Sequence, residues 1–168
     1  MEPQIEFSIR PAVGTDEPFL RLAGYDAAFP PGAERLSFAD ASKLPELSHY
    51  VDGWPRPDDL GVVAEDGERP IGAAWCRLFP ADDPGYGWVD AETPELAIGV
   101  VDGLRGQGVG RALMRALAEA ARAEGYVRLC LSVSQDNPGA VALYLTEGYR
   151  VVGIDDGGSL TMVLPLTG

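Results

Sequence analysis

The stretch that decides the fold is Arg105-Gly106-Gln107-Gly108-Val109-Gly110-Arg111, which lies between an apolar run and a helix-like repeat. The apolar run, residues 96–101, has the length and composition of a buried strand. After the glycines, apolar side chains recur at helical spacing, at Val109, Ala112, Leu113, Ala116, Leu117 and Ala120. The opposite face carries Arg111, Arg115, Glu119 and Arg122. The sequence therefore predicts a strand, a glycine loop and one amphipathic helix that stops at Gly125.

A glycine loop at the start of a helix can hold an anion. The first main-chain amides of a helix have no acceptor within the helix, and the helix dipole favours a negative charge there. Glycines alone can simply make a tight turn, but Arg105 and Arg111 flank these ones and favour an anion site. The dinucleotide fingerprint fails because Arg111 replaces its third glycine, and the chain has no Gly-Lys-Ser/Thr. NAD and ATP are therefore disfavoured.

The charge distribution points to the same segment. The chain has a net charge of −13, yet residues 105–128 hold five arginines and two glutamates. A basic island in an acidic chain indicates one local anionic ligand, whereas the overall balance excludes a general nucleic-acid binder. The acidic remainder favours a cationic second ligand, with a solvated surface as the plainer alternative.

The rest of the chain predicts a mixed α/β protein. Residues 127–133 alternate as a strand, and Asn137-Pro138 supplies an N-cap for a helix that ends near Gly148. Two hairpins are expected, one from 61–65 and 71–79 and a closing one from 149–154 and 159–166. A strand over 5–10 and a capped helix after Gly14 open the chain. Residues 25–60 and 80–95 are expected to be loops, apart from a short helix within 44–51.

Two motifs in this order resemble those of the GNAT superfamily of acyl-CoA-dependent N-acyltransferases. Its loop pattern, R/Q-x-x-G-x-G/A, is matched by Arg105, Gly108 and Gly110. Its second block, N-x-x-A-x-x-L-Y-x-x-x-G-F/Y, is matched by Asn137, Ala140, Leu143, Tyr144, Gly148 and Tyr149. The chain departs from the family just before the loop, with Asp102 and Leu104 where members often have proline and an aromatic residue. The resemblance covers residues 95–154.

The resemblance implies a single GNAT-like domain over residues 1–168. Its fold would be a central mixed, mostly antiparallel sheet of about six or seven strands with about four helices, splayed between 96–101 and 127–133. Acetyl-CoA would be the cosubstrate, without a metal, and would bind in that opening. The implied cofactor-binding residues are Ile98, Gly99, Val100, Arg105, Gly106, Gln107, Gly108, Val109, Gly110, Arg111, Asn137, Ala140 and Tyr144. For Asn137, helix capping alone is the alternative.

The family position of Tyr144 implies a general acid that protonates the leaving thiolate, with packing against Ala140 as the alternative. Glu95 is the candidate base, acting directly or through water. Its alternative is a solvated carboxylate beside Glu92 at the end of a strand. His49 is a second candidate base, although a lone histidine in this context is more typical of a surface or capping position.

The function expected is transfer of an acetyl group to a primary amine of a small molecule or peptide, by direct attack in a ternary complex. The alternative is a non-catalytic acyl-CoA-binding sensor on the same scaffold. The loops 25–60 and 80–95 would form the acceptor site. Their aromatic residues would either line it or cover the sheet, and they are Tyr25, Phe29, Phe38, Tyr50, Trp54, Tyr86 and Trp88.

The remaining expectations concern redox state and location. Cys76 and Cys130 lie in apolar runs and are expected to be free thiols, and with His49 they are too few for a metal cluster. Charges interrupt the first twenty residues and every long apolar run, so neither an export signal nor a membrane span is expected. A cytoplasmic protein without membrane or nucleic-acid partners is predicted, with a homodimer as a habit of the family.

Overall fold

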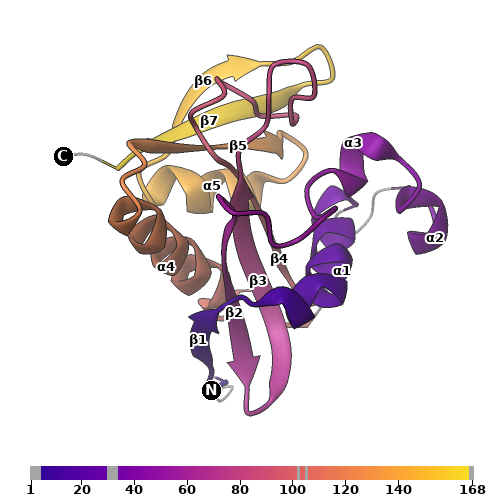
Figure 1. Ribbon diagram of the computed structural model, residues 1–168, viewed down its shortest axis with the longest axis vertical. Helices are drawn as coiled ribbons and strands as arrows, with labels where there is room; N and C mark the ends of the chain where they lie inside the picture. The colour runs from indigo at the N-terminus through magenta and orange to yellow at the C-terminus, as the bar shows by residue number, and fades with distance from the viewer. Residues whose placement is uncertain (1–4, 30–33, 102, 105, 167–168) are drawn as a thin grey trace. The chain divides into compact units, whose positions relative to one another are not determined.

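A computed structural model describes residues 5–29, 34–101, 103–104 and 106–166. In chain order (Figure 1), the elements are β1 (Ser8–Pro11), a 3-10 turn (Gly14–Asp16), α1 (Glu17–Ala28), α2 (Phe38–Ala41), α3 (Pro45–Ser48), β2 (Leu60–Asp66), β3 (Arg69–Arg77), β4 (Glu95–Val100), α4 (Val109–Ala123), β5 (Arg128–Ser134), α5 (Pro138–Thr146), β6 (Arg150–Ile154) and β7 (Ser159–Pro165). Both predicted hairpins, the amphipathic helix and the capped helix after Asn137 are confirmed.

In the described residues, the strands form one seven-stranded sheet in the order β1-β2-β3-β4-β5-β7-β6. The pairs β1–β2, β5–β7 and β6–β7 are antiparallel, whereas β4 and β5 are parallel with Glu95 opposite Cys130. The mixed, mostly antiparallel sheet is therefore confirmed, with five α-helices where about four were expected. The splay between the two parallel strands stays a prediction.

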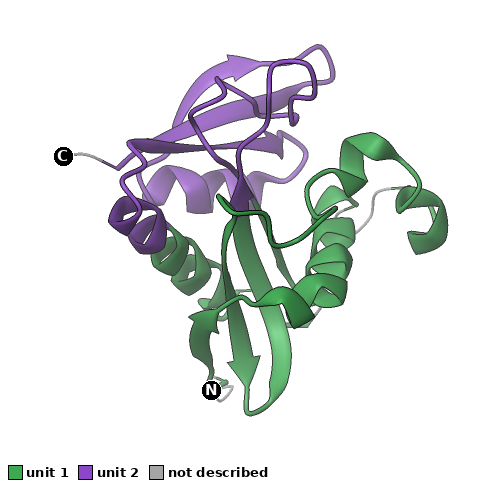
Figure 2. Ribbon diagram, in the orientation of Figure 1, with its two compact units in different colours: residues 1–75, 97–117 green, residues 76–96, 118–168 purple. Residues whose placement is uncertain are grey.

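The chain divides into two compact units (Figure 2). Unit 1 is Met1–Trp75 with Ala97–Leu117, and unit 2 is Cys76–Leu96 with Ala118–Gly168. The division falls within β3, β4 and α4, so neither unit is a continuous segment. The expectation of a single domain stays a prediction.

Unit 1 is built around a core in which aromatic and aliphatic side chains from α1, β2, β3 and the segment before β2 pack together. This core consists of Leu20, Ala23, Val51, Trp54, Val63, Ala73 and Trp75. The indole nitrogens of Trp54 and Trp75 donate to the carbonyls of Val13 and Tyr50, at 3.1 and 3.0 Å. These bonds satisfy polar groups that would otherwise be buried without partners, and they tie the irregular segment before β2 to the sheet.

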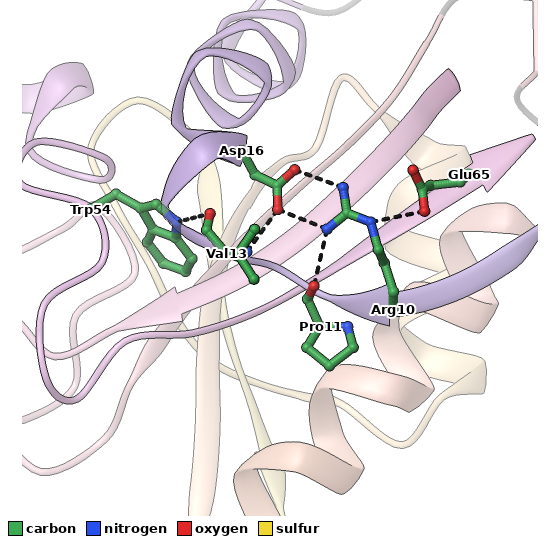
Figure 3. Close-up of polar contacts among 6 residues, drawn as sticks. All are labelled: Arg10, Pro11, Val13, Asp16, Trp54 and Glu65. Carbon is green, nitrogen blue, oxygen red and sulfur yellow. Dashed lines mark hydrogen bonds and ion pairs between the residues drawn. The ribbon is translucent and has the colours of Figure 1, made fainter. Parts of the chain in front are cut away.

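A cluster of ion-paired residues lies near the start of unit 1 (Figure 3). The guanidinium of Arg10 donates to both carboxylate oxygens of Asp16, at 2.8 and 2.7 Å, and to Glu65 at 2.8 Å. The amide of Val13 also donates to Asp16, at 2.7 Å. Together these bonds join β1, β2 and the start of α1.

The segment 25–60 contains more helix than its composition predicts. Helix α1 continues to Ala28, and α2 forms because Ser37 caps it, accepting a hydrogen bond from the Asp40 amide at 3.1 Å. Glycine and proline content could not reveal so short a capped turn.

Unit 2 rests on the β5–β7 ladder, which runs from Arg128 opposite Pro165 to Ser134 opposite Ser159. Strand β6 pairs with the other side of β7 and has a register shift between Val151 and Gly153. The core of this unit includes Leu129, Leu131 and Met162, each at most 2% exposed.

Candidate active site

The loop before α4 contains two glycines whose backbone conformation L side chains rarely adopt. Gly106 and Gly108 have φ of +80° and +85°, and a Cβ at either position would meet no atom within 4 Å. These glycines are therefore required by backbone conformation and not by lack of space. The Ala112 amide donates to Gly108, so the amides of Val109, Gly110 and Arg111 occupy the first helical turn, where helix geometry provides no acceptor.

Two residues of this loop have more specific positions. The side-chain oxygen of Gln107 accepts from the Ile5 amide at 3.3 Å, so Gln107 would serve a ligand through its main chain. Val109 is 1% exposed, so its side chain is buried at the start of α4. Arg105 lies outside the described residues, as does Asp102.

The predicted pantetheine strand lies in unit 1, within β4. A Cβ on Gly99 would lie 2.4 Å from the carbonyl oxygen of Ala23, so glycine here lets the backbone of α1 pack against β4. Ile98 and Val100 are half-buried. The main chain of this strand, and not the side chain of residue 99, is thus what the segment can offer to a ligand.

The second family block lies in unit 2. Asn137 caps α5, its side-chain oxygen accepting from the Ala140 amide at 3.3 Å, and Pro138 follows at the first helical position. The capping interpretation is confirmed, and a pantetheine contact for Asn137 and Ala140 stays a prediction.

Tyr144 is buried on α5, only 9% exposed, and its ring centroid lies 6.1 Å from that of Tyr149. Burial raises the pKa of Tyr144 to about 12. The phenol therefore keeps its proton at neutral pH. Burial also raises the pKa of Tyr149 above its ordinary range.

Glu95 opens β4 and is 2% exposed. The interpretation as a solvated carboxylate at the strand end is therefore wrong. Its Oε2 accepts a hydrogen bond of 3.2 Å from the amide of Gly87, in the loop that precedes β4. No motif marked Gly87, so sequence reasoning did not predict this contact.

Cys130 interacts with Glu95 and with Tyr149, the ring neighbour of Tyr144. It pairs with Glu95 in the sheet, and its burial and the Glu95 charge raise the pKa of its thiol above the ordinary range. It also contributes to raising the pKa of Tyr149, the ring neighbour of Tyr144. Cys76 and Cys130 are buried and, within the described part of the chain, neither forms a disulfide, as expected. A thiol that stays protonated is a poor nucleophile, which agrees with direct attack by the acceptor.

The other candidate residues cap a helix, pack in the core or contact neighbouring rings. His49 follows α3 as its C-cap and is 8% exposed, so the expected capping is confirmed and a surface position is wrong. Trp54 covers the sheet as part of the core of unit 1. Tyr25 contacts Phe29 and Phe38, with ring centroids 5.3 and 5.5 Å away.

Within the residues that the structure describes, no group of three or more His, Cys, Asp or Glu side chains could hold a metal ion. Over the same residues, none of the helices has the length and apolar character needed to cross a bilayer.

The predicted site residues do not all belong to one unit. Residues 98–100 and 106–111 belong to unit 1, whereas Glu95, Asn137, Ala140 and Tyr144 belong to unit 2.

Comparison with known proteins agrees with this geometry. A model of the acetyltransferase (GNAT) family matches residues 25–149. The chain belongs to this family. It is 33% identical over 139 residues to a mycothiol acetyltransferase of Jonesia denitrificans, over 80% of this chain and 40% of the relative. The corresponding enzyme of Kocuria rhizophila is 32% identical over 151 residues, 88% of this chain and 47% of the relative. The chain thus spans less than half the length of these curated relatives.

Solved structures share the fold. A GCN5-related N-acetyltransferase from Kribbella flavida superposes with a TM-score of 0.64 at 26% identity, over 95% of this chain and 97% of that one. YncA from Salmonella typhimurium, solved with its cofactor acetyl-CoA, has a TM-score of 0.66 at 20% identity, over 95% and 94% of the two chains. The second likeness shows the fold alone.

Proposed function

We propose that this GNAT protein transfers an acetyl group from acetyl-CoA to a primary amine by direct attack in a ternary complex. The observation that carries the proposal is the glycine loop before α4, where Gly106 and Gly108 have positive φ and a Cβ at either would meet no atom within 4 Å. This arrangement fits a pyrophosphate. The names of the mycothiol acetyltransferase relatives and the acetyl-CoA bound to YncA support the same ligand.

The residues that would hold the cosubstrate come from three segments. The amides of Val109, Gly110 and Arg111 would bind pyrophosphate, the main chain of 98–100 would pair with the pantetheine arm, and Asn137 with Ala140 would contact it from α5. Bound acetyl-CoA supplies an acyl thioester that is reactive toward a neutral amine.

The division of chemistry follows from the two buried side chains. An alkyl amine with a pKa of about 10.4 is neutral in only roughly one molecule per thousand at pH 7, so a base that accepts its proton accelerates attack. Glu95 is assigned to this step, directly or through water. Tyr144, whose phenol keeps its proton, is assigned to protonate the departing thiolate sulfur.

The acceptor is proposed to be a small-molecule amine or a peptide amine, bound by the loops 25–60 and 80–95. The mycothiol acetyltransferases among the relatives favour the small molecule. The net charge of −13 favours a cationic acceptor. A cytoplasmic location is proposed on the two buried thiols, which suit a reducing compartment. A homodimer is proposed on the family resemblance, and sedimentation velocity tests it.

Calorimetric titration with CoA tests the glycine loop. Wild type should bind CoA, and a variant with Gly108→Glu and Gly110→Glu should bind at least about 100-fold more weakly, because two carboxylates would face the pyrophosphate. Equal affinities would overturn the proposal. Thiol release from acetyl-CoA with a panel of amines then separates the two candidate functions, since binding without turnover on any acceptor would favour a sensor.

A further inference from the structure

We propose that Gly87 is a positioning residue for Glu95: its main-chain N–H, held in place by the connecting loop of residues 78–94, fixes the buried carboxylate for proton transfer. The inference rests on the proposed function, because it gives Gly87 a role only through the base that Glu95 would be. It rests on geometry within unit 2.

The first observation is the lack of space at Gly87. A Cβ there would lie 2.4 Å from the carbonyl carbon of Leu131 and 2.6 Å from both the Leu131 oxygen and the Ser132 nitrogen. These are backbone atoms of β5, which cannot turn aside as a flexible side chain can. Any side chain at position 87 would therefore lift the connecting loop off the strand.

The second observation is what this close approach achieves. With its Cα against β5, Gly87 donates its N–H to Glu95 Oε2 at 3.2 Å, in a buried setting. Glu95 itself pairs with Cys130, the residue before Leu131. Adjacent residues of β5 therefore position both groups: Cys130 pairs with Glu95, and the backbone of Leu131 lies against Gly87. A hydrogen bond to a carboxylate is strong and directional where water is excluded, so it fixes which oxygen faces away from the amide.

The third observation is that the connecting loop is fastened around this contact. The indole nitrogen of Trp88 donates to the Phe79 carbonyl at 2.9 Å. Near the end of the loop, Arg128 on β5 donates to the Thr93 hydroxyl at 3.0 Å and forms an ion pair with Asp90. The Cys130 amide donates to the Pro94 carbonyl at 3.0 Å. A loop held at these points keeps the Gly87 N–H in one place.

Other charged and titratable groups surround this contact and set the background of any pH profile. They are Cys130 on β5 and the ion pair of Asp90 with Arg128. A substitution at Gly87 alters none of these charges directly. A changed pH profile would therefore report on how the connecting loop surrounds Glu95, the Gly87 amide included.

The test compares Gly87→Ala with Gly153→Ala in the full chain, because a Cβ at Gly153 would meet nothing within 4 Å. Gly87→Ala should lower kcat by about 10- to 100-fold, the effect of losing one hydrogen bond to a charged group. The KM for acetyl-CoA should stay within about twofold, and the acidic limb of the kcat/KM profile should move to higher pH, because the carboxylate loses a donor. Gly153→Ala should behave as wild type.

A double-mutant cycle with Glu95→Gln decides whether Gly87 acts through Glu95. In the Glu95→Gln background, Gly87→Ala should lower kcat by less than about twofold further. Losses that multiply, or an unchanged pH profile, would overturn the inference while leaving the proposed function intact. Full activity of Glu95→Gln, or a wild type that acetylates no amine, would overturn the assigned base and the inference together.

If Gly87→Ala fails to fold, Trp88→Phe replaces it in the same cycle. This change keeps an aromatic ring beside Gly87 but removes the hydrogen bond to Phe79. It should lower kcat by about 2- to 5-fold, and the loss should vanish in the Glu95→Gln background. A loss of equal size in both backgrounds would overturn the inference.

Discussion

Two loops of this chain depend on glycine for opposite reasons. Before α4, Gly106 and Gly108 have positive φ and open space around them, so glycine is needed for the backbone conformation. In the connecting loop, Gly87 is not among the glycines with positive φ, but a Cβ there would overlap the backbone of β5. The first kind of glycine gives the backbone turn that leads into α4, and the second brings one amide within hydrogen-bond distance of a buried carboxylate.

The difference teaches what each loop contributes to a proposed transferase. A loop whose amides bind a large anion governs affinity for the cosubstrate. A buried amide governs the orientation of one catalytic group and should act on turnover instead. Substitutions in the two loops should therefore separate KM from kcat.

The largest effect on activity is expected from a substitution of Tyr144. This residue belongs to the family motif and, like Glu95, is buried. Tyr144→Phe keeps the ring packed near Tyr149 and removes the proton that the phenol would donate. We expect kcat to fall by about 10- to 1000-fold, with CoA affinity nearly unchanged, in steady-state kinetics and calorimetry. Full activity would show that water protonates the thiolate and that the motif residue only packs.

The next effect is expected at Glu95. If it accepts the proton of the amine, Glu95→Gln should lower kcat/KM by about 10- to 100-fold at pH 7. The loss should shrink as pH rises toward the pKa of the acceptor, because the substrate then supplies its own neutral form. Rate profiles from pH 6 to 10 would measure this. A loss of the same size at every pH would assign Glu95 to substrate binding.

Local patterns predicted most of the fold. The apolar repeat from Val109 predicted α4, the Asn137-Pro138 pair predicted the start of α5, and the glycine motif predicted a turn before α4, because each of these signals lies in neighbouring residues. The burial of Glu95 could not be predicted in this way, because it depends on the packing of a motif-free loop on β5 through Gly87. The same holds for His49, whose burial depends on tertiary packing.

A smaller effect, on cosubstrate affinity, is expected from Gly108→Ala. Alanine is strained at a φ of +85°, so the amides of the glycine loop should turn and the KM for acetyl-CoA should rise by about 3- to 10-fold, with kcat within about twofold. Gly67→Ala is the matched control, since Gly67 has a φ of +65° and equally open space in the β2–β3 turn. Both variants should lose similar stability in urea titrations, and a raised KM in Gly67→Ala would contradict the assignment.

The smallest effect on activity is expected at Asp16 in unit 1, which takes part in neither loop. Hydrogen bonds from Arg10, with a further one from the Val13 amide, hold the pKa of Asp16 below its ordinary value. The unfolded chain therefore binds this proton more readily, and the stability that Asp16 provides is present at neutral pH and is lost as pH falls below about 4.

Asp16→Asn should accordingly lower the free energy of unfolding by about 1 to 3 kcal/mol at pH 7, with kcat unchanged. The gap between variant and wild type should narrow on acidification, since protonation weakens the wild-type contacts in the same way. Glu65→Gln, which affects a single bond from Arg10, should cost less. Urea unfolding at several pH values measures all three proteins. A gap that widens at low pH would mean that Asp16 stabilises unit 1 by some means other than its charge.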